Sequence, residues 1–126
     1  MRNVIDTNVW IDALTGKLAA APFLKITVQA SWIGYSAITR LELFGLPGIK
    51  DEEENKIAEL LKPFKEIAVD SRIIDKAIRV RKAKRIKVPD AIIAATALEK
   101  ECSLITRNVD DFKDIPDLVV IDPYTV

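Results

Sequence analysis

The sequence predicts an α/β layer fold built around a mainly parallel sheet. Short apolar runs alternate with longer segments whose apolar residues recur at helical spacing, and cap or turn residues separate the two kinds of segment. The composition is 49% hydrophobic and 30% charged with 4 Gly and 6 Pro, which excludes disordered and collagen-like chains. Because 126 residues suit one domain and no linker or repeat interrupts them, we expect a single domain over residues 1–126.

The N-terminal part predicts two strands and two helices. Val4-Ile5 is a short apolar run, and Asp6-Thr7-Asn8, which closes it, has the side chains of a helix N-cap. The helix that follows is expected to end at Gly16, a residue that suits a helix C-cap. A second helix is expected over Leu18–Ala30, and Trp32–Tyr35 reads as the second strand.

The middle of the chain predicts three helices and a third strand. A helix begins at Ser36 and stops at Gly45-Leu46-Pro47-Gly48. The acidic run Asp51–Glu54 begins another helix, which Pro63 ends. The third strand is expected at Ile67–Val69, and a strongly basic helix follows it. The apolar positions that predict the first of these helices are Ile38, Leu41 and Phe44.

The C-terminal part predicts a central helix and the last two of five strands. Pro89 suits the first position of a helix, because that position needs no backbone donor. Ala91–Leu98 is almost wholly apolar and small, so we expect this helix to be buried on most sides. Leu104-Ile105 and Leu118–Ile121 are apolar runs bounded by turn residues, as expected of strands.

The charged and reactive residue types limit the chemistry. The chain has 19 Lys and Arg, 19 Asp and Glu, one Cys and no His, which excludes imidazole bases, internal disulfides and thiolate zinc sites. Metal or acid–base chemistry would therefore fall to carboxylates that bind a hard cation through oxygen. The start has no apolar h-region, and no 18-residue apolar run follows, so we expect a cytoplasmic setting and no membrane partner.

Acidic and amide side chains follow two of the predicted strands. Asp6 comes after the first strand, and Asn108, Asp110 and Asp111 follow the strand at Leu104-Ile105. In a parallel sheet both groups would face the same edge, where open α/β sheets bind ligands. The simpler alternatives are that Asp6 caps the next helix and that Asp110 and Asp111 form a turn.

Two further acids lie on predicted helices. Glu42 is at the border of an apolar stripe, where a charge costs several kcal/mol unless it is paired or bound to metal. The alternatives are an ion pair with Arg40 or another cation, or a side chain that extends into solvent. Asp90 lies in a first helical turn, where the helix dipole alone stabilises it by about 0.3 to 1 kcal/mol. Caps, turns and dipoles do not explain why Glu42 joins this set.

A basic stretch lies between Arg72 and Lys87. It has eight basic residues against one acid, Asp75, and could hold about three to five nucleic-acid phosphates by counterion release. The alternative is a solvated helix face. The eight residues are Arg72, Lys76, Arg79, Arg81, Lys82, Lys84, Arg85 and Lys87.

Four blocks of the sequence resemble the PIN-domain family, in particular the small VapC-like toxins of bacterial and archaeal toxin–antitoxin pairs. They match in order and spacing along nearly the whole chain. The resemblance implies a PIN-like three-layer α/β/α fold with a central, mainly parallel five-stranded sheet. The blocks are VIDTNVWID (4–12), SAITRLELFG (36–45), PDAIIAATA (89–97) and LITRNVDDF (104–112).

The resemblance also implies a site. The family's acidic pocket carries over to Asp6, Glu42 and Asp90, which would hold one or two Mg²⁺ or Mn²⁺ ions. The fourth block differs from the family pattern, because Asn108 stands where many relatives have an aspartate. The role of the fourth acid of the pocket therefore passes to Asp110 or, as a second choice, to Asp111. The side chains expected to support these ligands are Thr7, Ser36, Thr106, Asn108 and Asp111.

The implied activity is metal-dependent hydrolysis of RNA phosphodiester bonds. The resemblance further implies a homodimer and inhibition by a cognate VapB-like antitoxin, and it makes Arg79, Lys82 and Arg85 candidate RNA contacts. One alternative is a PIN-like module that binds RNA or protein without cutting. The other is a Mg²⁺-binding receiver-type signalling domain, against which the lone acid after the first strand and Arg107 after Thr106 both count.

Overall fold

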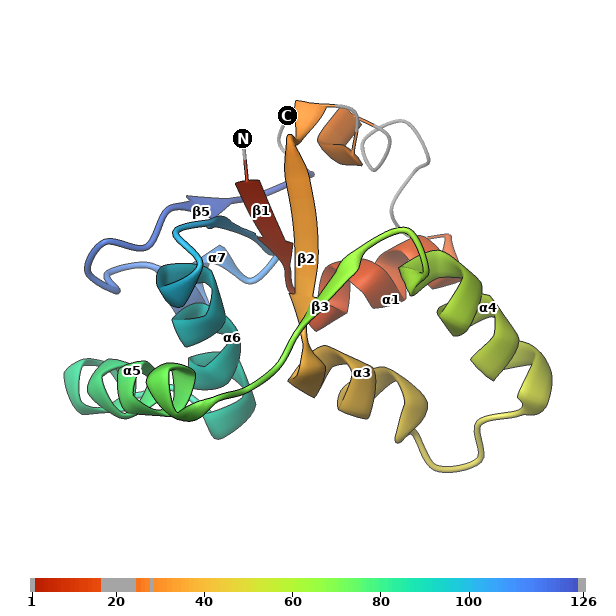
Figure 1. Ribbon diagram of the computed structural model, residues 1–126, viewed down its shortest axis with the longest axis horizontal. Helices are drawn as coiled ribbons and strands as arrows, with labels where there is room; N and C mark the ends of the chain where they lie inside the picture. Colours follow the sequence, from red (N-terminus) through yellow and green to blue (C-terminus); the bar gives the residue numbers. More distant parts are fainter. Residues whose placement is uncertain (1, 17–24, 28, 125–126) are drawn as a thin grey trace.

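The structure is a computed structural model that describes residues 2–16, 25–27 and 29–124 (Figure 1). Most of the helix expected over Leu18–Ala30 lies outside the described residues, although 25–27 and 29 are helical. In chain order the elements are β1 (Arg2–Ile5), α1 (Thr7–Thr15), β2 (Trp32–Ser36), α3 (Ala37–Phe44), α4 (Asp51–Leu61), β3 (Lys65–Ile67), α5 (Ser71–Ala83), α6 (Val88–Glu99), β4 (Ser103–Ile105), α7 (Val109–Phe112) and β5 (Val120–Ile121).

The five strands form one sheet in the order β3-β2-β1-β4-β5, and every neighbouring pair is parallel. The predicted five-stranded parallel sheet is therefore confirmed. Ile5 is in register with Ile105, so β1 and β4 end side by side. The chain runs outward from β1 on one side through β2 and β3, and on the other through β4 and β5. The gap between β1 and β4 is therefore a topological switch point, the usual ligand site of such sheets.

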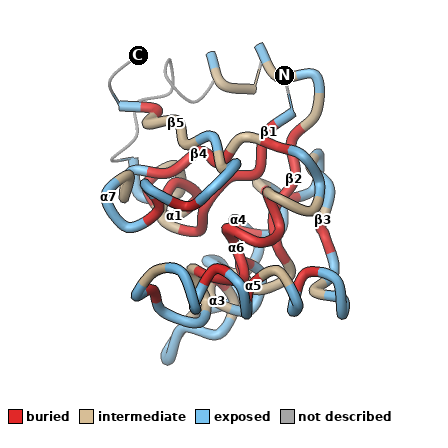
Figure 2. Tube along the Cα trace, turned by 90° about the vertical axis from the view of Figure 1, so that its left-hand side faces the viewer, coloured by how far each residue is buried: buried red, intermediate tan, exposed pale blue. Residues whose placement is uncertain are grey.

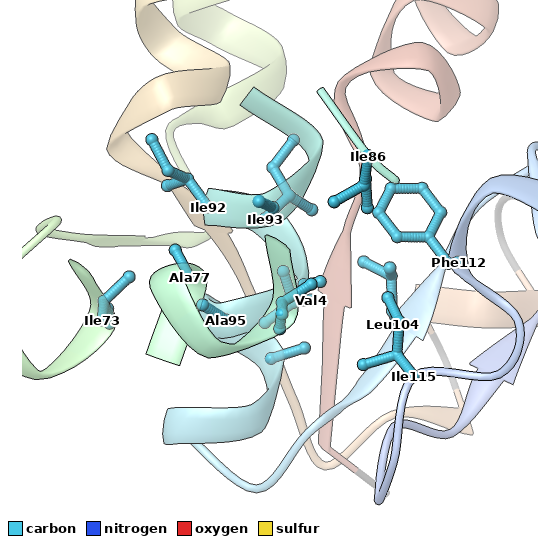
Figure 3. Close-up of a cluster of buried hydrophobic side chains, with 14 of the residues drawn as sticks. Val4, Ile73, Ala77, Ile86, Ile92, Ile93, Ala95, Leu104, Phe112 and Ile115 are labelled. Atoms are coloured by element: carbon cyan, nitrogen blue, oxygen red, sulfur yellow. The ribbon is translucent and has the colours of Figure 1, made fainter. Parts of the chain in front are cut away.

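Helices cover both faces of the sheet, with α5 and α6 on one side and α1 and α4 on the other (Figure 1). Successive strand residues point to opposite faces. Val4 and Leu104 accordingly join the cluster under α5 and α6, which Figure 3 shows, whereas Ile5 and Ile105 join the cluster under α1 and α4. Because both faces are buried at the centre of the sheet, β1 and β4 end in the short apolar runs Val4-Ile5 and Leu104-Ile105 and not in alternating ones.

Helix α6 is buried on most sides, as the sequence predicts. Every residue from Ala91 to Ala97 is buried (Figure 2). Pro89 is the second residue of the helix. It packs closely with α5 in the core of Figure 3. In the described part of the chain, no helix is long and apolar enough to cross a membrane.

Three expectations on local structure were wrong. The third strand is Lys65–Ile67 and not Ile67–Val69, because its pairing with β2 ends at Ile67 and the chain then leads to Asp70, which caps α5. The last strand is limited to Val120–Ile121. On α3 the buried face is formed by Thr39 and Leu43, so Leu41 is 65% exposed although it fits the apolar spacing.

Candidate active site

Asp6 lies at the switch point where β1 ends. Its backbone N–H donates to the carbonyl oxygen of Ile105 at 2.9 Å, which ties the ends of β1 and β4 together. The residue is 1% exposed. Asp6 occupies the N-cap position of α1, yet its side chain makes no capping bond. The capping alternative therefore does not account for this buried carboxylate.

The Asp6 carboxylate is instead held by the segment after β4. Thr106 Oγ1 donates to Asp6 Oδ2 at 2.8 Å, and the same hydroxyl oxygen accepts the backbone N–H of Asn108 at 3.0 Å. Because an accepted hydrogen bond polarises a hydroxyl, the Asn108 N–H strengthens the bond from Thr106 to Asp6. The expected supporting role of Thr106 thus has a specific contact behind it.

Glu42 reaches the same region from α3. Thr7 Oγ1 donates to Glu42 Oε1 at 2.8 Å, and Thr39 Oγ1 lies 2.8 Å from Thr7 Oγ1. Because Thr7 has one hydroxyl proton and gives it to Glu42, Thr39 is the donor to Thr7. Arg40 pairs with Glu66 at 2.5 Å, so the alternative ion pair with Glu42 is not formed.

Thr39 was not among the sequence candidates. The signal that could have found it is its position three residues before Glu42, which places both side chains on one face of α3. Ser36, by contrast, was expected to support the acids directly. It is buried, and its side chain accepts the N–H of Ile38, so it fixes the start of the helix that carries Thr39 and Glu42.

Asp6, Glu42 and Asp90, here called the acidic triad, form one electrostatic group. The pKa of Asp6 is raised to about 6, mainly by burial and also by the charges of Asp90 and Glu42, while hydrogen bonds from Thr106 and the Thr7 backbone act against the rise. Burial likewise raises the pKa of Asp90, as do the charges of Asp111 and Glu42, while Lys87 lowers it. Glu42 therefore makes ionisation of both aspartates less favourable, and Asp90 does the same to Asp6.

The donor set of the triad fits a hard divalent cation. Its ligand atoms are all carboxylate oxygens, and none of the three acids forms an ion pair with a residue that the structure describes. As the side chains stand, no group of three acids in the described ranges encloses a metal-sized position. A cation would relieve the mutual repulsion while the side chains rotate toward it.

The residues after β4 differ in how they face the triad. Asp110 has a side chain that is 91% exposed and pairs with Lys113 at 3.3 Å. Asp111 is also exposed, but its charge is the largest electrostatic influence on Asp90. Asn108 is half-buried and contributes its backbone N–H to Thr106.

A buried anchor beside the site was missed by sequence reasoning. Asp12 on α1 has a side chain that is 2% exposed, and Arg107 Nη1 donates to its two oxygens at 2.9 and 3.0 Å. The hydroxyl of Tyr124 donates to Asp12 Oδ2 as well. The partners lie 95 and 112 residues away along the chain, so no local pattern indicates this anchor.

The basic stretch divides into two parts. Lys76 pairs with Glu99 at 3.7 Å, and Arg79 lines a cavity of about 710 Å³ whose lining also includes Glu101 and Asp117. That cavity contains none of the triad. Lys82 and Arg85 are exposed and belong to the second part of the stretch, which lies closer to Asp90 in the sequence.

Comparisons with known proteins agree with this geometry. The model of the PIN domain matches residues 4–118. The chain is 31% identical over 130 residues to Ribonuclease VapC of Rickettsia bellii (strain RML369-C), covering 94% of this chain and 93% of that protein. It resembles a toxin-antitoxin complex from Klebsiella pneumoniae with a TM-score of 0.79 and 31% identity, over 97% of this chain and 98% of the other. VapBC-1 from nontypeable Haemophilus influenzae has a TM-score of 0.84 at 24% identity over 98% and 99%, which supports the fold.

Proposed function

The chain belongs to the PIN-domain family, and from this premise we propose that it is a VapC-like toxin that hydrolyses RNA phosphodiester bonds with Mg²⁺ or Mn²⁺. The observation that carries the proposal is the acidic triad. Three acids from separate segments interact electrostatically at and near the switch point, and none of them forms an ion pair with a described residue. Such an arrangement costs stability unless it serves a bound metal.

The triad would hold one or two metal ions, and a bound ion would supply an activated water and stabilise charge on the phosphate. The protein's own residues prepare the ligands. Thr106 orients Asp6, and the pair Thr39 and Thr7 orients Glu42. These bonds restrict the two carboxylates before metal binds, so the rotation that brings them onto a cation costs less entropy.

For the fourth ligand position the contacts favour Asp111 over Asp110. The charge of Asp111 acts on Asp90, whereas Asp110 is directed to Lys113. Asn108 adds no charge and already serves Thr106 through its backbone.

The relatives support the partners. A VapB-like antitoxin is proposed for this chain because a similar chain is described in a toxin-antitoxin complex. The homodimer stays a prediction from the family resemblance. We place its action in the cytoplasm, where an RNA substrate and an antitoxin would be found.

Cleavage of labelled RNA by the purified chain, freed of antitoxin, tests the function. We expect cleavage with Mg²⁺ or Mn²⁺, none in excess chelator, and loss of cleavage in Asp90→Asn. The matched control is Asp51→Asn, an exposed acid at the start of α4, which should cleave like wild type. Undiminished cleavage in chelator would refute the metal dependence, and metal-dependent RNA binding without cleavage would favour a binding module.

A further inference from the structure

A second charged feature lies where α5 ends. A cavity of about 310 Å³ is formed there by the last helical turn and the chain that follows it. Four of its six lining residues are cationic, and no described acidic side chain lines it. The lining residues are Arg81, Lys82, Ala83, Lys84, Arg85 and Ile86.

Two of these cations are held by neutral groups. Arg81 Nε donates to the carbonyl oxygen of Ile86 at 3.2 Å. Lys84 Nζ donates to the carbonyl oxygens of Asp110 and Lys113 at 2.9 and 2.6 Å. Backbone carbonyls fix the position of a cation without cancelling its charge. The cavity therefore has a preorganised positive charge, and an anion that binds there has less side-chain entropy to remove.

The other two cations are free to meet a ligand. Lys82 and Arg85 are exposed, and neither forms an ion pair with a residue that the structure describes. Lysine offers a point charge and arginine a planar set of donors, and both suit phosphate oxygens.

The cavity is connected to the acidic triad along the chain. Ile86 is buried, whereas Arg85 and Lys87 on either side of it are exposed. Lys87 caps the helix whose first turn carries Asp90. The five residue-to-residue steps from Arg85 to Asp90 can span at most about 18 Å, a distance that a few nucleotides of RNA would cover. Lys84 is also tied to α7, the helix of Asp111.

We propose that this cavity binds a backbone phosphate of the RNA, a few nucleotides from the bond that is cleaved. Lys82 and Arg85 would contact the phosphate, and Arg81 and Lys84 would keep the cavity in shape. The proposal rests on the proposed function, since it assigns a substrate contact to the same enzyme. It selects two of the three sequence candidates and leaves Arg79 to the other cavity.

Binding of a fluorescein-labelled single-stranded RNA to the full chain in chelator tests the cavity, with salt varied from 0.1 to 1 M. The test variant is Lys82→Gln with Arg85→Gln. Loss of one phosphate contact should lower the log–log salt slope by about 0.7, which weakens binding about 5-fold more at 0.1 M than at 1 M salt. In Mg²⁺ the same variant should cleave with a raised KM and an unchanged kcat.

The control is Lys56→Gln with Lys62→Gln, which removes the same amount of charge. Lys56 is an exposed residue of α4 and Lys62 is the exposed residue that follows it, and α4 lies on the other side of the sheet from α5 (Figure 1). The control should bind RNA like wild type. Equal salt slopes of RNA binding for wild type and the test variant would overturn the cavity assignment alone. If the test variant then bound the antitoxin more weakly than wild type does, the cavity would be assigned to the antitoxin. A wild type that neither binds nor cleaves RNA would overturn the proposed function as well.

Discussion

Asp6 and Asp12 are both 1% exposed and lie six residues apart, yet their surroundings have opposite effects on a charge. Asp12 accepts two bonds from Arg107 and one from Tyr124, so its negative charge is compensated. Asp6 accepts a bond from Thr106 but faces two further acids. Equal burial thus serves two purposes: one carboxylate anchors the segment after β4 to α1, and the other is, in our proposal, available to bind a metal ion.

The largest expected difference between the two regions is in catalysis. Asp90→Asn removes one charge from the triad and should lower the metal-dependent cleavage rate about 1,000-fold, because a metal ligand is lost. Asp12→Asn should cleave RNA at the wild-type rate under conditions in which the variant is folded. Initial rates at saturating Mg²⁺ measure both. Equal losses in the two variants would mean that the anchor and the site are not separate.

The dependence of stability on pH should report the burial of the Asp6 carboxyl group. The pKa of Asp6 rises from 3.8 to about 6 on folding, so between these values the folded protein binds more protons than the unfolded chain. The stability of the metal-free protein should therefore fall as pH rises through this window, by about 3 kcal/mol in all.

Asp6→Asn lacks this loss, because an amide does not titrate. Urea unfolding in chelator at pH 4 and pH 7 gives the free energy of unfolding of each protein, and the effect is the value for the variant minus the value for wild type. This difference should grow with pH. A difference that stays constant would mean that Asp6 is ionised in the folded protein as easily as in the unfolded chain.

A smaller effect is expected at the anchor. Asp12→Asn leaves Arg107 and Tyr124 without their charged acceptor and should destabilise the fold by about 2 kcal/mol. The Mg²⁺ response of the folded variant should be unchanged. Thermal melts with and without Mg²⁺ report both quantities, and a variant that loses its Mg²⁺ response while keeping its stability would contradict the division of roles.

The smallest effect should separate the two acids of α7. Asp111→Asn should lower cleavage about 10-fold if Asp111 supports the metal, and Asp110→Asn should leave it unchanged, since Asp110 pairs with Lys113. The two variants remove the same charge from adjacent exposed positions, so each controls for the other. A loss confined to Asp110→Asn would restore the first choice made from the sequence.

The success of each prediction from the sequence depends on how far apart in the chain the interacting residues lie. The parallel sheet and the buried α6 were predictable because apolar runs, caps and Pro89 are local signals. Leu41 misled because spacing alone does not say which face of α3 meets the core. The bond from Thr106 to Asp6 spans 100 residues, and the partners of Asp12 are as distant, so only the fold brings them together.

The most direct test of the acidic triad as a metal site is the unfolding of wild type and Asp6→Asn at pH 7, each in chelator and in Mg²⁺. In chelator the variant should be at least as stable as wild type, because one repelling charge is gone. Mg²⁺ at about 100 times its dissociation constant should stabilise wild type by about 2.7 kcal/mol and the variant by less. If Mg²⁺ changes neither protein, or both equally, Asp6 is not a ligand and the triad is not a metal site.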